Sequence, residues 1–171
     1  MKRSRLNTAF LLSITSAWAH PTFVYTNNNG SVNSVSAFSV GVNGALTPVA
    51  GSPFPTGGTG GPSATGSTQI ITTLAKHFVY VTNPGSFSPP QSSTISAFSI
   101  DTSTGKLKLV PGSPFPSGLG RIGGLAITPD DKYLIITNES LAQIAVNSIG
   151  ADGTLTPVPG SPFLAGVYCG R

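Results

Sequence analysis

The sequence predicts an all-β protein, a β-propeller with about three four-stranded antiparallel blades. Two observations carry this prediction. Three sequence landmarks recur in the same order along the chain, and turn-forming residues separate short apolar runs. The blades are expected at roughly residues 20–67, 68–121 and 122–171, and together they form residues 20–171, a partial propeller after a separate segment at 1–19.

The landmarks define the repeat. An apolar run closes with Thr-Asn at residues 23–27, 78–83 and 133–138, with asparagines at Asn27, Asn83 and Asn138. A run of the type Val-Ser-Ala-Phe-Ser-Val follows at 35–40 and 95–100, with a weaker copy at 144–149. Gly-Ser-Pro-Phe closes each unit at 51–54, 112–115 and 160–163. The apolar run of the first unit has one residue fewer than the others, which marks that unit as a departure from the pattern.

The third unit shows the expected strands most plainly. Short strands are predicted at 125–128, 133–137, 144–149 and from 154 to 158, separated by turns at 129–132 and 151–153. The last strand of every unit is rich in proline, which cannot donate to a sheet ladder. We therefore expect this strand to be the outermost one of its blade.

The composition fits a protein with many turns. Charged residues make up only 8% of the chain, while it has 21 glycines and 15 prolines. Disorder is disfavoured because β-branched and aromatic residues recur in compact runs. Without residues 1–19 the balance is six basic against five acidic side chains. No basic patch remains, so nucleic acid is not an expected partner.

Residues 1–19 have the pattern of a secretory signal. Lys2, Arg3 and Arg5 precede a short apolar core, and Ala17-Trp18-Ala19 has the form of a cleavage site. The protein is thus expected to be exported, to the periplasm, the cell surface or the medium. The alternative is that this segment is a strand of a preceding, degenerate repeat. No apolar run approaches the ~20 residues of a membrane span.

The Tyr-Val-Thr-Asn run at 80–83, with Ser-Ala-Phe-Ser and the Ile-Thr-Pro-Asp turn at 127–130, resembles the YVTN-type repeat of the β-propeller lactonase-like family. That family includes 6-phosphogluconolactonases, exported repeat proteins and surface-layer propellers. The resemblance implies a seven-bladed ring when complete, so this chain would be part of one. It also implies ligand binding on the face formed by the loops between second and third strands and between blades.

Ionisable residues are few on that face. Glu139 and Arg121 are the candidates, as a base that activates water and a cation that stabilises an oxyanion in lactone hydrolysis. Asp101, Asp130, Asp131 and Asp152 fall in turns of the opposite face, where aspartates bond their own turn backbone. The three repeat asparagines are expected to close turns.

No cofactor and no metal are expected. The chain has two histidines far apart in sequence, a single cysteine, Cys169, and no acidic cluster. The expected function is a binding or scaffold module, and a small carbohydrate-like molecule is a candidate ligand. The alternatives are a sugar-lactone hydrolase and a surface-layer or adhesion module. An arc of three blades leaves two apolar faces bare, so further blades or self-association are expected to cover them.

Overall fold

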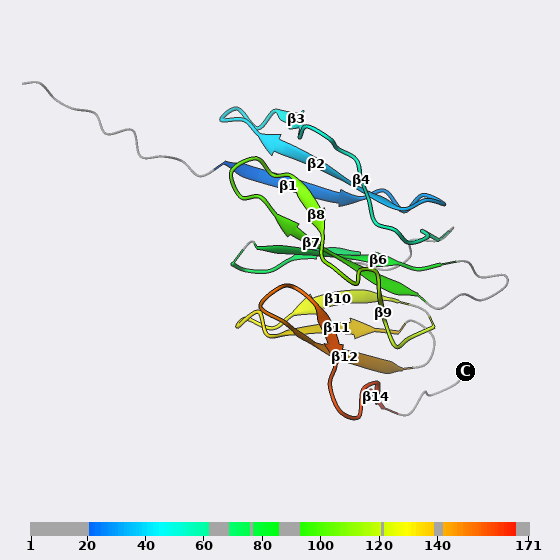
Figure 1. Cartoon of the computed structure of the whole chain (residues 1–171). Helices are drawn as coiled ribbons and strands as arrows, with labels where there is room; N and C mark the ends of the chain where they lie inside the picture. Colours follow the sequence, from blue (N-terminus) through cyan, green and yellow to red (C-terminus); the bar gives the residue numbers. More distant parts are fainter. Residues whose placement is uncertain are drawn as a thin grey trace, which may run out of the picture.

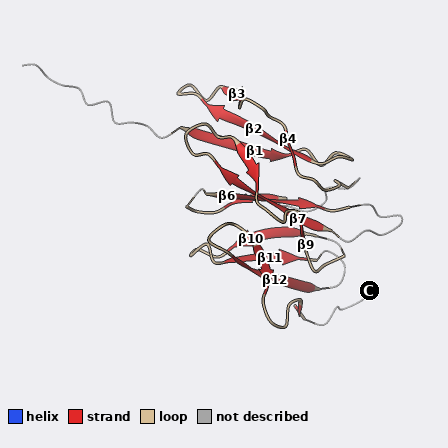
Figure 2. Ribbon diagram, in the orientation of Figure 1, coloured by secondary structure: helices blue, strands red, loops and turns tan. Residues whose placement is uncertain are grey.

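The computed structural model describes residues 21–61, 69–75, 77–85, 93–120, 122–138 and 142–166. Within these residues the chain forms strands and turns and contains no helix, as Figure 2 shows. It follows that none of the described residues belongs to a helix that could cross a membrane. The strands form three antiparallel sheets that stack in chain order (Figure 1), and the predicted all-β, blade-like architecture is confirmed.

Each sheet is one blade. The first contains β1 (Thr22–Asn27), β2 (Ser34–Val40), β3 (Leu46–Pro48) and β4 (Phe54–Pro55). The second contains β5 (Ile70–Thr72), β6 (Phe78–Asn83), β7 (Thr94–Ile100), β8 (Leu107–Leu109) and β9 (Phe115–Pro116). The third contains β10 (Gly124–Ile127), β11 (Tyr133–Thr137), β12 (Gln143–Ile149), β13 (Leu155–Pro157) and β14 (Phe163–Leu164). Among the described residues, the first blade has no counterpart of the innermost strands β5 and β10.

The outermost strand differs from the prediction, because it is two short segments that both pair with the third strand of the blade. In the second blade, β8 pairs with one end of β7 and β9 with the other. Between them the backbone NH of Ala97 donates to Ser113 Oγ at 3.0 Å. The serine of the Gly-Ser-Pro-Phe landmark thus takes the place of a ladder carbonyl. The other blades repeat the bond, from Ala37 to Ser52 and from Val146 to Ser161.

The register of the strands corrects the expectation of a missing residue in the first blade. Phe23 lies opposite Ser39 in the first blade, as Phe78 lies opposite Ser99 in the second. Counting along β1 from this pair, Asn27 corresponds to Thr82, and the counterpart of Asn83 is Asn28. The run is therefore complete, and Thr-Asn-Asn at 26–28 replaces Val-Thr-Asn at 81–83.

The turn between the first two strands of the second blade keeps its geometry despite its changed sequence. Thr73 Oγ1 accepts the backbone NH of Phe78 at 3.2 Å, just as Thr128 Oγ1 accepts the NH of Tyr133 at 3.0 Å. The threonine that ends the first strand therefore maintains the turn, and the Pro-Asp-Asp sequence of the third blade is not required for it.

The core lies between blades. Between the first and second blades it includes Val35, Val79 and Phe98, all fully or almost fully buried. A larger cluster between the second and third blades includes Tyr80, Leu134 and Ile136. The strands carry apolar side chains on both sides, so a face of each sheet can pack against a neighbouring sheet and become buried. The outward faces of the first and third blades have no neighbour among the described residues.

Candidate functional site

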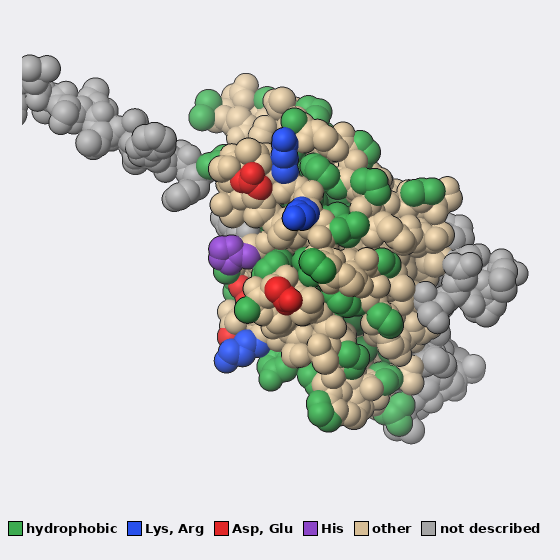
Figure 3. All heavy atoms as spheres, in the orientation of Figure 1, with side chains coloured by type: hydrophobic (Ala, Val, Ile, Leu, Met, Phe, Trp, Pro, Cys, Tyr) green, Lys and Arg blue, Asp and Glu red, His purple; other side chains and the backbone are tan. Residues whose placement is uncertain are grey.

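The two ends of the strands differ in chemistry. Loops that join second to third strands, together with links between blades, lie at one end, which we call the loop face. Hairpins lie at the other end, the hairpin face. In the described part of the chain, the loop face carries no Asp, Glu, Lys, Arg or His. Figure 3 shows the charged side chains on the left-hand half of the view, where β1 begins and the hairpins lie.

Glu139 and Arg121, the predicted catalytic candidates, lie outside the described residues. The structure therefore neither brings them together nor separates them. The segments next to them are placed at the loop face: β11 ends at Thr137, and Ile122 is buried in the cluster between the second and third blades.

A buried polar network at the loop face joins the first two blades. Asn33 Nδ2 donates to Asn83 Oδ1 at 2.9 Å and to the carbonyl of Thr82 at 3.0 Å. Thr56 Oγ1 donates to Asn83 Oδ1 at 2.8 Å, and Ser96 Oγ donates to the carbonyl of Thr56, also at 2.8 Å. These side chains are 0 or 1% exposed. Asn83 is thus a connector between blades, and the expectation that it closes a turn is wrong.

Asn83 also forms hydrogen bonds with two residues of its own blade. These contacts identify Asn28 as the corresponding residue of the first blade. Its Nδ2 donates to Ser96 Oγ at 2.7 Å and to Thr94 Oγ1 at 3.1 Å. Asn28 contacts the corresponding two residues: its Nδ2 donates to Ser34 Oγ at 2.9 Å, and its Oδ1 accepts from Ser36 Oγ at 3.1 Å. Asn28 is exposed, however, because no blade among the described residues precedes the first one.

Sequence reasoning missed this network. Its signals were the asparagine at residue 33 and the serine at residue 96, polar residues next to or within apolar strands. A buried polar side chain needs partners, so such positions indicate contacts with a neighbouring element. The network is neutral, with amides and hydroxyls only. Its buried groups donate and accept hydrogen bonds among themselves, and it contains no group that would take up a proton near neutral pH.

Three of the four described aspartates have the role that the sequence predicted. Asp101 accepts from the NH of Ser103 at 2.9 Å and from its hydroxyl at 2.6 Å. These hydrogen bonds, with those from Thr104, lower the pKa of Asp101 to about 2. Bonds from Thr128 and from Thr154 likewise lower the pKa values of Asp130 and Asp152.

Asp131 is the exception. Its carboxylate accepts the backbone NH of Leu74 at 2.7 Å and of Ala75 at 2.8 Å, in the first turn of the second blade. The backbone of Asp131 has a φ of 57°, a conformation that aspartate tolerates better than most residues. The carboxylate of Asp131 therefore bridges two blades at the hairpin face, and only its backbone NH, which donates to the carbonyl of Thr128 at 2.9 Å, belongs to its own turn.

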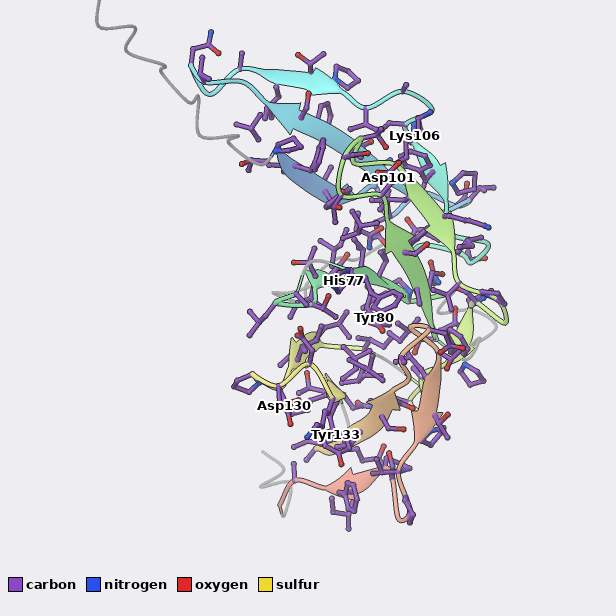
Figure 4. The ribbon with its side chains drawn as sticks, turned by 60° about the vertical axis from the view of Figure 1, so that its left-hand side comes forward. His77, Tyr80, Asp101, Lys106, Asp130 and Tyr133 are labelled. Carbon is purple, nitrogen blue, oxygen red and sulfur yellow. The ribbon has the colours of Figure 1, made fainter. Side chains whose placement is uncertain are left out.

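Two pockets open between blades at the hairpin face. One of about 410 Å³ is lined by Phe23, Tyr25 and Thr72 among others. The other, of about 330 Å³, is lined by His77, Phe78 and Asp131 among others. Figure 4 shows His77 and Asp130 near this end of the blades. Burial, and then the charge of Asp101, raise the pKa of Tyr25 to about 12, so that its hydroxyl keeps its proton.

No cluster of three or more His, Cys, Asp or Glu side chains that could hold a metal occurs in the described ranges. His20 and Cys169 lie outside these ranges. The chemistry available at the loop face is therefore hydrogen bonding by neutral groups, as far as the structure describes it.

Comparison with known proteins gives a family match. The model of a family described as lactonase, seven-bladed β-propeller, matches residues 17–166. No curated protein matches the chain. Among solved structures, a putative 6-phosphogluconolactonase from Bacteroides uniformis is similar with a TM-score of 0.66 and 21% identity, over 83% of this chain and 37% of its own.

Two further structures are similar. A putative 6-phosphogluconolactonase from Bacteroides fragilis has a TM-score of 0.58 and 21% identity, over 80% of this chain and 35% of its own. The periplasmic gluconolactonase PpgL of Pseudomonas aeruginosa has a TM-score of 0.59 and 15% identity, over 83% of this chain and 40% of its own. The chain thus spans well under half the length of the structures it resembles.

Proposed function

Because the chain belongs to the family of seven-bladed β-propeller lactonases, we propose that it is a block of blades with a binding or scaffolding role in a larger ring. One observation carries the proposal: the described loop face offers amides and hydroxyls and no acid or base. Such groups suit a small carbohydrate-like ligand, which presents hydroxyls that both donate and accept. Lactone hydrolysis, in contrast, needs a proton acceptor.

The block is proposed to work with further blades or with other copies of itself. Supporting observations are the two uncovered blade faces and the 35 to 40% share of the solved propellers that the chain spans. Size-exclusion chromatography with light scattering on residues 20–171 tests this point. Assembly or aggregation is the expected result, and a soluble monomer that melts cooperatively would contradict it.

Export is part of the same proposal. The signal pattern at residues 1–19 supports it, and one similar structure is named a periplasmic enzyme. Cleavage after Ala19 would leave His20 as the first residue. Mass spectrometry of secreted protein checks this, and secreted material that still begins at Met1 would contradict it.

Sugar-lactone hydrolysis is the second candidate. The family match favours it, and so do the names of the two Bacteroides structures. In that case Glu139 would act as the base and Arg121 would stabilise the oxyanion. The discriminating experiment follows acid release from 6-phosphogluconolactone and glucono-δ-lactone at constant pH.

The assay compares the unchanged chain with Glu139→Gln, Arg121→Gln and, as a control on the hairpin face, Lys132→Gln. A binding role predicts the spontaneous hydrolysis rate for all four proteins. Hydrolysis by the unchanged chain that is lost in Glu139→Gln and kept in Lys132→Gln would replace the binding role with the enzymatic one.

A further inference from the structure

Both contacts between blades share one arrangement, which we call the tyrosine latch. Tyr25 in β1 donates its hydroxyl to the carbonyl of Gly105, in the β7–β8 hairpin of the next blade, at 3.1 Å. Tyr80 in β6 does the same to Gly153 in the third blade, also at 3.1 Å. Figure 4 places Tyr80 between the second and third sheets.

A phenylalanine two residues before each tyrosine completes the latch. The ring of Phe23 lies against Gly105, and the ring of Phe78 lies against Gly153, so that a Cβ on either glycine would collide with the ring. Both glycines also have a positive φ, of 74° and 85°. The first and second blades thus each present Phe-x-Tyr to a hairpin glycine of the following blade, and that glycine cannot be replaced without strain.

The outward face of the first blade carries the receiving half of this latch, unused. Gly44 has the place of Gly105 and Gly153 in the β2–β3 hairpin, with a φ of 80°. In the part of the chain that the structure describes, a Cβ on Gly44 would meet nothing within 4 Å. Asn28 stands exposed on the same face, at the position where Asn83 receives Asn33 and Thr56 from the preceding blade.

Apolar side chains of this face are uncovered in the same way. Val24 is 41% exposed, whereas its counterpart Val79 is fully buried against the first blade. Leu46 is 53% exposed, whereas its counterpart Leu107 is 7% exposed. The outward face of the first blade therefore repeats, position by position, a face that is buried elsewhere in the same molecule.

The third blade lacks the presenting half. Strand register places Tyr133 where Phe78 stands and Ile135 where Tyr80 stands, opposite Ser148 and Val146. Isoleucine has no hydroxyl to donate. Ala142 and Ala165, which share a backbone hydrogen bond as Asn33 and Thr56 do, replace that polar pair. A second copy that docked through its third blade would leave Asn28 and the Gly44 carbonyl without their donors.

We propose that the outward face of the first blade binds a propeller blade that carries Phe-x-Tyr on its second strand and an amide and hydroxyl pair like Asn33 and Thr56. This blade comes from chain outside residues 21–166, and it is not the third blade of another copy. The proposal rests on the proposed role as a block of blades, and it specifies the partner surface by its residues.

The test gives a copy of the chain the missing groups. The probe is the full chain with Ile135→Tyr, Ala142→Asn and Ala165→Thr, so that its third blade presents the tyrosine and the polar pair of the latch, with Tyr133 as the aromatic residue in the place of Phe78. It also carries Gly44→Asn, which blocks the receiving glycine on the probe's own first blade. Asparagine tolerates the positive φ of this position. The control probe carries Gly44→Asn alone. Binding of each probe to the unchanged chain is measured by sedimentation velocity over a concentration series.

The expected result is a one-to-one complex that the latch probe forms about tenfold more tightly than the control probe, since each added hydrogen bond contributes modestly. The gain should vanish when the target also carries Gly44→Asn. Equal binding of the two probes overturns the proposal, as does a gain that survives in the Gly44→Asn target. If the fourfold variant does not melt cooperatively, Ile135→Tyr with Gly44→Asn serves as the probe under the same criteria.

This experiment is separable from those of the proposed function. Light scattering on the unchanged chain reports whether any assembly occurs, and the lactone assay reports chemistry. If the latch probe bound no more tightly than the control probe, the proposed partner surface would be wrong. The light-scattering result and the lactone-assay result would be unaffected.

Discussion

The hydroxyl of Tyr80 and the carbonyl of Gly153 form a hydrogen bond of 3.1 Å that joins the second blade to the hairpin of the third. Tyr80 is fully buried, so its hydroxyl has no water to replace that carbonyl. We expect Tyr80→Phe to lower the free energy of unfolding by about 1 kcal/mol, the usual net contribution of one hydrogen bond. Urea unfolding followed by circular dichroism measures it.

Tyr133→Phe is the matched control. Tyr133 is 40% exposed and lies on the outward face of the third blade. The same removal of a hydroxyl should there change the free energy of unfolding by no more than about 0.5 kcal/mol. Equal losses in the two variants would show that the latch contributes nothing specific.

Asn147 in β12 offers the opposite case. Its Nδ2 is buried and has no hydrogen-bond partner among the described residues, and its side chain is 2% exposed. The same strand position in the second blade is Phe98. Because an unpaired buried donor costs about 1–3 kcal/mol, we expect Asn147→Leu to raise the free energy of unfolding, by about 1 kcal/mol after imperfect packing.

Asn83→Leu makes the comparison decisive. Both asparagines are buried, but Asn83 has four side-chain hydrogen-bond partners in two blades. Its loss strands the amide of Asn33, so a loss of about 3 kcal/mol or more is expected. Thermal melts of Asn83→Leu and Asn147→Leu compare the stabilities of the two variants. If Asn147→Leu destabilised the fold as much as Asn83→Leu, the conclusion that the Asn147 amide is unpaired and the Asn83 amide is paired would be contradicted.

The serine of each Gly-Ser-Pro-Phe landmark should matter through its hydroxyl. Ser113→Ala removes the acceptor for the NH of Ala97, at a place where no ladder carbonyl is available. A loss of about 1–2 kcal/mol is expected. Ser99→Ala, at an exposed hydroxyl that donates to Lys108 at 3.3 Å, should cost much less. Chemical denaturation of both proteins tests the difference.

Acid should weaken the fold in a defined window. The folded-state pKa of Asp101 is about 2, below the value of about 3.9 in an unfolded chain. The stabilisation is therefore complete above about pH 4 and is lost as the pH falls toward 2. Asp101→Asn keeps an acceptor for the turn but no longer titrates. We expect its melting temperature to fall less between pH 5 and pH 2 than that of the unchanged chain.

The fold could be predicted because its signals are local. Each Gly-Ser-Pro-Phe lies at the break of an outer strand, and each apolar run forms a second strand. Register was harder, since two asparagines follow Thr26 and the sequence match favours the wrong one. Only the pairing of Phe23 with Ser39 distinguishes Asn28 from Asn27.

Contacts between blades were the part that sequence could not supply. Asn33 and Asn83 are 50 residues apart, and nothing local indicates that they bind each other. Asp131 looked like its neighbour Asp130, yet it reaches the second blade because its own backbone turns to a positive φ. For Glu139 and Arg121 the prediction stands untested, since they lie outside the described residues.

The serine of the outer-strand break has a consequence for how such chains diverge. Its bond to the third strand is internal to one blade, so a duplicated blade carries donor and acceptor together and selection acts on each copy alone. The landmark is accordingly unchanged in all three copies. The tyrosine latch links two copies, so its halves can drift once a neighbour changes, as Tyr25, Tyr80 and Ile135 illustrate. The serine contact, which lies inside each blade, is thus the same in all three copies, whereas the presenting half of the latch between blades differs in the third copy.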